Sequence, residues 1–247
     1  MASLYLVDSL DGVTVGGSVA LDGLEGRHAV TVSRVRVGET LRLSDGRGTV
    51  VVGPVESVDR DALVLTVATI TTSPVPVPSL TLVQALAKGG RDEMAVQAAT
   101  EIGVDHVVPW AAARSVSRWE GAKVAKGRAR WQAIAHEAAK QAIRSRVPSV
   151  SDPVTTTAIA ATTAPSAGVV VLVLDPTATE RLATWEPPAD ATSIALVVGP
   201  EGGIDASELD RLSAAGAVRV RLGDTVLRTS TAGPAALAVL QSRLGRW

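Results

Sequence analysis

The chain has 247 residues, and its 24 lysines and arginines nearly balance 25 aspartates and glutamates, so the formal net charge is only −1. This balance excludes a polybasic tail or a histone-like protein. Charged residues make up 20% and hydrophobic residues 46% of the chain, which is the composition of a globular protein and not of a disordered one. A chain of this length is expected to fold as two domains more readily than as one.

Cysteine is absent, which excludes disulfides, thiolate metal sites and cysteine nucleophiles. None of the three histidines lies at metal-ligand spacing from another, so we expect no metal site. The longest aliphatic run, residues 169–174, is too short to span a bilayer. Asp8 and Asp11 interrupt the apolar stretch that a signal peptide would need. These features predict a soluble cytoplasmic protein.

The first 72 residues are predicted to form a small all-β barrel or sandwich. Short runs of Val, Leu and Thr alternate there with Gly and Asp turn signals, at residues 30–37, 40–43, 49–52 and 63–70. Three prolines at alternate positions in residues 73–79 then favour an extended chain and forbid helix. We therefore expect a β domain at residues 1–72, a proline-rich linker at 73–79 and a second domain at 80–247.

The second domain shows strands that alternate with helices. Strands are expected at residues 80–85, 106–108, 169–174, 194–198 and 218–222, and helices near 92–102, 126–144, 206–215 and 234–244. Gly103 is expected to end the first helix, Asp205 and Glu208 to form a capping box, and Pro234 to stand in the first turn of the last helix. This alternation predicts an α/β domain with a mostly parallel sheet covered on both faces.

Open sheets of this class bind ligands at the carboxyl ends of their strands, and three loops there are unusual. After residues 194–198 comes a glycine-rich turn, residues 199–203, whose backbone can approach a ligand closely, although it can equally be a simple connection. After residues 218–222 comes an eleven-residue linker, 223–233, rich in hydroxyls around Arg228, with a flexible surface loop as the alternative. The loop after residues 106–108 holds Arg114 and Ser115.

Basic residues are concentrated in one part of the chain. Residues 114–146 contain nine Lys or Arg against two Glu. Such a stripe indicates either a phosphate-binding surface or an ordinary solvated helix face. In the first 72 residues nine acidic residues outnumber six arginines, so a second basic surface there has weaker support.

These motifs, taken together, resemble the RsmE family of bacterial 16S rRNA uridine N3 methyltransferases, within the SPOUT (trefoil-knot) superfamily. The resemblance covers nearly the whole chain. Its strongest pieces are LVVGPEGG at residues 196–203 with Glu208, and LGDTVLRT at 222–229 with Ala232. Supporting pieces are KGGR at 88–91, QAATEIG at 97–103, Arg114-Ser115, the positions Glu137, Gln141, Arg144 and Pro148, and His28 with RVRVGE at 34–39.

The resemblance implies an N-terminal PUA-like RNA-binding barrel and a C-terminal domain that binds S-adenosylmethionine, without a metal, in a deep trefoil knot at a homodimer interface. It implies that the cofactor is held largely by main-chain groups of Leu196, Gly199, Pro200, Glu201, Gly202, Gly203, Leu222, Gly223, Val226 and Leu227. The implied reaction is methylation of N3 of a uridine in 16S rRNA of the small ribosomal subunit.

For this reaction we expect Arg228 to stabilise the charge that develops on the uracil, and Glu201 to act as a base or an orienting group. The expected RNA contacts are Arg34, Lys88, Arg91, Arg114, Gln141 and Arg144. Three positions depart from the family pattern: Ser230 replaces a usual Glu, Ala98 a Lys and Thr225 an Arg. Two alternatives therefore stay open, a non-catalytic ribosome-assembly factor and a SPOUT enzyme for another RNA base.

Overall fold

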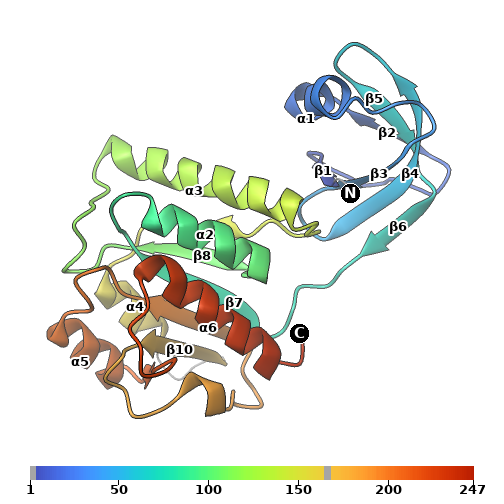
Figure 1. Cartoon of the computed structure of the whole chain (residues 1–247). Coiled ribbons are helices and arrows are strands. Elements are labelled where there is room, and N and C mark those ends of the chain that lie inside the picture. Colours follow the sequence, from blue (N-terminus) through green and yellow to red (C-terminus); the bar gives the residue numbers. More distant parts are fainter. Residues whose placement is uncertain (1–3, 164–167) are drawn as a thin grey trace. The chain divides into compact units, whose positions relative to one another are not determined.

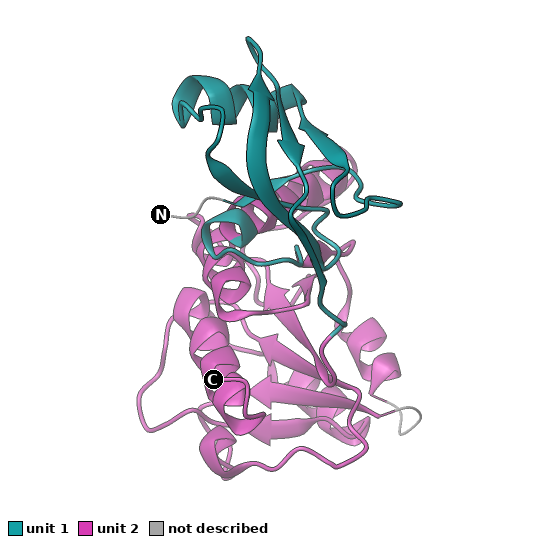
Figure 2. Cartoon of the chain, turned by 90° about the vertical axis from the view of Figure 1, so that its right-hand side faces the viewer, with its two compact units in different colours: residues 1–75, 139–147 teal, residues 76–138, 148–247 magenta. Residues whose placement is uncertain are grey.

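The computed structural model describes residues 4–163 and 168–247, which form two compact units (Figure 2). Unit 1 comprises residues 1–75 and 139–147, and unit 2 comprises residues 76–138 and 148–247. The inclusion of residues 139–147 in unit 1 brings a later part of the chain to the β-rich region, a grouping that no local pattern reveals. The domain limits of 1–72 and 80–247 stay a prediction.

Unit 1 is built on a six-stranded sheet, with the order β1-β3-β4-β5-β2 and β6 paired with β4. The strands β1 and β3 are parallel and the other neighbours antiparallel. Its apolar core includes Leu43, Val51 and Leu65, which are all fully buried. The strands are β1 (Leu4–Leu6), β2 (Ser18–Leu21), β3 (Thr40–Ser44), β4 (Thr49–Val58), β5 (Leu63–Thr66) and β6 (Thr69–Thr72).

The strand expected at residues 30–37 is wrong. The chain instead forms the short helix α1 (Gly23–Arg27), followed by the π-helical turn η1 (His28–Val32). Arg34 then adopts a left-handed backbone conformation with φ of 54°. Ala29 is fully buried, so packing against the sheet overrides the local preference of this Val-rich run for a strand.

Unit 2 contains a six-stranded, all-parallel sheet with the order β12-β10-β11-β7-β8-β9, of which β7, β8 and β10 are labelled in Figure 1. Alternate residues of its central strands point to opposite faces, and both faces are apolar: Leu82 and Leu196 face one core, Val83 and Val197 the other. The strands are β7 (Ser79–Ala85), β8 (His106–Trp110), β9 (Ser149–Val150), β10 (Val169–Leu174), β11 (Ser193–Val198) and β12 (Val218–Val220).

Helices cover both faces of this sheet, which confirms the predicted α/β architecture. Helices α2 (Arg91–Ile102), α3 (Ala122–Gln141) and α6 (Thr229–Arg243) contribute to the core on one face. Helices α4 (Thr156–Thr162) and α5 (Ala206–Ala214) contribute to the core on the other, and a short 3-10 helix, η2 (Leu182–Thr184), follows β10. Within residues 4–163 and 168–247, every helix is too short or too polar to cross a bilayer.

Two of the helix ends that the sequence predicts are confirmed, and one is wrong. Gly103 ends α2 with a left-handed φ of 109°, and Asp205 and Glu208 form the capping box of α5. Pro234 does not stand in the first turn of α6, because this helix begins five residues earlier, at Thr229. The backbone N–H groups of Thr231 and Ala232 already donate to the carbonyl of Arg228. The linker expected at residues 223–233 is therefore shorter, because it ends at Arg228, before α6.

Candidate active site

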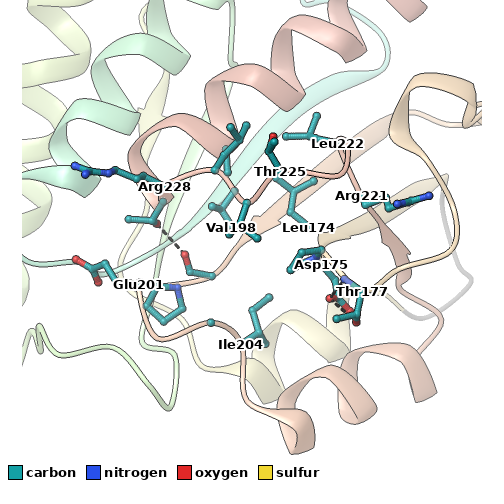
Figure 3. A pocket seen from close by; sticks show the side chains of 18 of the residues that line it. Leu174, Asp175, Thr177, Val198, Glu201, Ile204, Arg221, Leu222, Thr225 and Arg228 are labelled. Atoms are coloured by element: carbon teal, nitrogen blue, oxygen red, sulfur yellow. Dashed lines mark hydrogen bonds between the residues drawn. The ribbon is translucent and has the colours of Figure 1, made fainter.

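A pocket of about 600 Å³ lies in unit 2 where the neighbouring strands β10, β11 and β12 end (Figure 3). Its walls come from residues 174–177 at the end of β10, from 198–201, 203 and 204 at the end of β11, and from 220–223 and 225–228 at the end of β12, with additions from α2, α5 and α6. This position at the carboxyl ends of parallel strands is where open α/β sheets bind their ligands. Glu201 and Arg228 lie at one end of the pocket, and Asp175, Thr177 and Arg221 lie at the other.

The glycine-rich turn after β11 needs glycine at two positions for different reasons. A Cβ at Gly199 would lie 2.6 Å from Cγ1 of Ile204, so this position allows a close approach of two chain segments. Gly203 has a left-handed φ of 73°, and its N–H donates to the carbonyl of Pro200 at 2.9 Å, which closes the turn.

Buried side chains anchor the start of this turn. The hydroxyl of Thr229, the first residue of α6, donates to the carbonyl of Gly199 at 2.8 Å. The amide of Gln84, which is fully buried at the end of β7, donates in turn to that hydroxyl at 2.8 Å. The main chain at the pocket edge is therefore fixed by a hydrogen-bonded relay from two neighbouring elements.

Glu201 is held as a carboxylate. Its Oε1 accepts from Nη1 of Arg91 at 3.0 Å and from the backbone N–H of Lys88 at 3.3 Å. Burial alone would raise the pKa of Glu201, but hydrogen bonds from its own backbone, from Arg91 and from Lys88, together with the charge of Arg91, hold that pKa below its ordinary value. A carboxylate of lowered pKa is a weak proton acceptor at neutral pH, so this geometry favours the orienting role over the role of base.

Arg228 lines the pocket at the end where Glu201 lies, and its unpaired guanidinium extends outward from the cavity (Figure 3). Its side chain is exposed and precedes α6. In the described part of the chain, it forms no ion pair or side-chain hydrogen bond, whereas Arg91 is bound to Glu201 and Arg221 is bound to Asp224 at 2.8 Å. Among the arginines that line the pocket, Arg228 is thus the one without a partner in the described residues.

The loop after β10 contributes a polar cluster that was not among the predicted site residues. Asp175 is only 5% exposed, and its carboxylate accepts from the N–H and hydroxyl of Thr177, both at 2.8 Å, and from Nε of Arg219 at 2.6 Å. Burial raises the pKa of Asp175, but these hydrogen bonds and the charge of Arg219 outweigh it and lower the pKa overall. The signal in the sequence was the Asp-Pro pair directly after the run 169–174, at a strand end.

Asp175→Asn is expected to reduce the free energy of unfolding by about 1 kcal/mol at neutral pH, since solvent screens the half-exposed Arg219. Because the folded-state pKa is lowered, the carboxylate stabilises the fold above the ordinary aspartate range, about pH 4, and this contribution disappears as the pH falls below it. Urea unfolding of the wild-type protein and of Asp175→Asn should show a difference in the free energy of unfolding that is constant from pH 7 to 5 and shrinks in acid. A difference that persists in acid would contradict the assignment.

The expected cofactor residues mostly meet at this pocket. Those that line it are Gly199, Pro200, Glu201, Gly203, Leu222, Gly223, Val226 and Leu227. Of the residues that the structure describes, the lining set does not include Leu196 or Gly202. Leu196 is fully buried in the apolar core, and the carbonyl of Gly202 accepts a hydrogen bond from Arg114.

The expected RNA contacts fall in both units. Arg34, Gln141 and Arg144 belong to unit 1, and Arg34 and Gln141 are exposed there. Unit 2 holds Lys88, Arg91 and Arg114. Arg91 lines the pocket, and Arg114 pairs with Asp205 at 3.0 Å, so both of these guanidinium groups already have protein partners.

Comparisons with known proteins decide the family. Residues 73–241 match the family described as RNA methyltransferase domain, and residues 21–68 match that described as RNA methyltransferase PUA domain. The whole chain is 45% identical, over 249 aligned residues that cover 94% of the relative, to Ribosomal RNA small subunit methyltransferase E of Mycobacterium bovis. The chain belongs to the RsmE family of RNA methyltransferases.

More distant relatives agree with this membership. The Bacillus subtilis protein of the same name is 29% identical over 226 residues, which cover 90% of this chain and 88% of that protein. The crystal structure of the Neisseria gonorrhoeae family member bound to S-adenosyl methionine superposes with a TM-score of 0.85 at 29% identity, covering 98% of each chain. The predicted combination of a PUA-like domain with an α/β methyltransferase domain is therefore confirmed.

Proposed function

We propose that the chain transfers a methyl group from S-adenosylmethionine to N3 of a uridine in 16S rRNA of the small ribosomal subunit. The observation that carries this proposal is the pocket formed by the turn after β11 and the segment after β12, in a chain that aligns over its full length with a small subunit methyltransferase. The family membership favours this enzyme over a non-catalytic assembly factor and over an enzyme for another base.

The pocket fits the cofactor in size and in lining. Its volume of about 600 Å³ lies within the range of small-molecule sites. Gly223 lies on its wall, and a Cβ at this position would meet nothing within 4 Å, so the absence of a side chain leaves room for a ligand beside the backbone. When bound, the cofactor supplies the electrophilic sulfonium methyl.

The residues of the pocket supply position and charge. The fixed turn around Gly199 and the segment 222–227 orient the methyl donor, and alignment of reacting groups can account for much of the rate enhancement. Arg228 stabilises the negative charge that develops on the uracil as its N3 proton leaves. Glu201, held ionised by Arg91, orients groups at the same end of the pocket.

Ser230 is compatible with this enzyme. It occupies the second position of α6, and among the residues described it is not one of those that line the pocket. The exchange of the family's usual Glu for Ser at this position therefore leaves the pocket walls intact.

The proposal includes RNA contacts by Arg34, Lys88, Gln141 and Arg144 and by the exposed parts of Arg91 and Arg114. It also includes a homodimer and a cytoplasmic location, where 16S rRNA is found, on the strength of the family resemblance. A trefoil knot is the last element of the proposal, and it rests on the family resemblance.

The purified protein should incorporate label from methyl-labelled S-adenosylmethionine into 3-methyluridine when it is incubated with small ribosomal subunits that lack the modification. Digestion of the RNA and separation of its nucleosides identify the product. A labelled nucleoside other than 3-methyluridine would support a different base, and cofactor binding without any label would support the assembly factor.

A further inference from the structure

Arg114 holds the glycine-rich turn from outside the pocket. Its Nη1 donates to the carbonyl of Gly202 at 3.3 Å, and its Nη2 pairs with Oδ2 of Asp205 at 3.0 Å. The guanidinium therefore connects two points of the segment that runs from β11 to α5. Arg114 itself is not one of the pocket-lining residues described, so its influence on a ligand passes through this turn.

The loop that carries Arg114 is fixed at its base. The N–H of Ala113 donates to Oε1 of Glu208 at 2.9 Å, and the hydroxyl of Thr156 donates to the same oxygen at 2.6 Å. Glu208 is only 7% exposed and belongs to the capping box of α5. Arg118 adds hydrogen bonds to the carbonyls of Ala112 and Ala113. Arg114 thus projects from a braced loop and not from a free one.

Close packing adds to these bonds. A Cβ at Gly202 would lie 3.4 Å from Cβ of Arg114, which places the backbone of the turn against the base of the arginine side chain. On the pocket side, Arg91 holds Glu201, the residue before Gly202. Two arginines, one at the start of α2 and one in the loop after β8, therefore hold adjacent residues of one turn.

We propose that Arg114 is a positioning residue of the cofactor pocket, which fixes residues 199–205 in their binding conformation before RNA arrives. This inference rests on the proposed function, because it requires that the pocket binds S-adenosylmethionine. The physical reason is preorganisation: a turn that is already ordered loses less conformational entropy when a ligand binds. A role in RNA binding alone would leave cofactor affinity unchanged.

The test measures cofactor binding by calorimetry in the absence of RNA, with the full chain. Arg114→Lys keeps the positive charge but loses the forked geometry that reaches both partners. Asp205→Asn keeps a good helix N-cap but removes the charge that Arg114 binds. Each variant is expected to raise the Kd for S-adenosylmethionine about five- to tenfold. Because both substitutions remove the same interaction, the Kd of the double variant is expected to be no higher than that of the single variant with the higher Kd.

The chain offers a matched control in the pair Arg128–Asp152, which is 3.1 Å long and has a similarly exposed arginine. Arg128→Lys and Asp152→Asn make the same chemical changes away from the turn and should leave the Kd unchanged. Melting temperatures of all variants separate loss of cofactor binding from loss of fold.

The outcomes distinguish the inference from the function on which it rests. Wild-type affinity for S-adenosylmethionine in both single variants, or additive losses in the double variant, would overturn the positioning role. Failure of the wild-type protein to bind the cofactor would instead overturn the proposed function. Asp205→Asn removes a negative charge, which should not weaken contacts with the phosphates of RNA. A raised Kd for S-adenosylmethionine in this variant is therefore not explained by a lost RNA contact.

Discussion

Arg228→Ala is expected to reduce the rate of methyl transfer by about 100- to 1,000-fold while the Kd for S-adenosylmethionine stays nearly unchanged. The guanidinium of Arg228 has no protein partner within the described residues, so its removal breaks no ion pair of the pocket. Its loss is felt when negative charge develops on the uracil, because a nearby cation in a pocket stabilises that charge more than water does. Single-turnover rates with small subunits and calorimetric cofactor titrations measure the two quantities separately.

A conservative change and a matched arginine sharpen this test. Arg228→Lys keeps the charge in a different shape and should retain part of the activity. Arg243→Ala removes an arginine from the opposite end of α6, where it pairs with Glu186, and should leave both quantities unchanged. An equal loss of turnover and cofactor affinity in Arg228→Ala would assign this residue to cofactor binding.

The parallel sheet could be predicted because its strands are buried on both faces. Strand β10 coincides with the apolar run at residues 169–174, and β11 extends the run 194–198 by one residue. Buried strands of this kind form continuous apolar runs between turn signals, which makes them visible in sequence. Strand β9, with two residues, and helix α4 carry no such signal, and they were not expected.

The wrong elements are those where packing overrides local preference. Residues 30–37 read as a strand because they are rich in Val, yet Ala29 and Val35 are buried through a helical turn and a left-handed residue, Arg34. Pro234 suggested the start of a helix, yet α6 begins at Thr229, whose hydroxyl donates to the carbonyl of Gly199, a residue thirty positions earlier. Such contacts are set by the tertiary structure, and periodicity does not contain them.

The candidate site, too, could be predicted from the sequence only in part. The turn after β11 and the segment around Arg228 were visible as unusual strand-end loops. The Asp175 cluster was missed because its place in the pocket depends on strand order: β10 lies between β11 and β12, although it precedes both in sequence. Arg91 and Arg114 were expected to contact RNA, whereas their partners within the chain, Glu201 and Asp205, follow only from the folded geometry.

Gly199→Ala is expected to raise the Kd for S-adenosylmethionine by at least about tenfold and to reduce the free energy of unfolding by about 1–3 kcal/mol. The new methyl group would lie 2.6 Å from Cγ1 of Ile204, closer than real contacts allow, so the turn must shift. That shift also disturbs the hydrogen bond from Thr229 to the carbonyl of Gly199. Calorimetric titration and urea unfolding measure the two effects.

Two further variants separate the steric cause from a general intolerance of the turn. Gly202→Ala places its methyl group 3.4 Å from Cβ of Arg114, which is an ordinary van der Waals contact, and should have little effect. Ile204→Ala removes the atom with which the methyl group collides, so its combination with Gly199→Ala should recover part of the lost affinity, a non-additive result typical of residues in contact. Equal losses in Gly199→Ala and Gly202→Ala, without recovery in the double variant, would show that the turn requires glycine for backbone freedom and not for the close approach of Ile204.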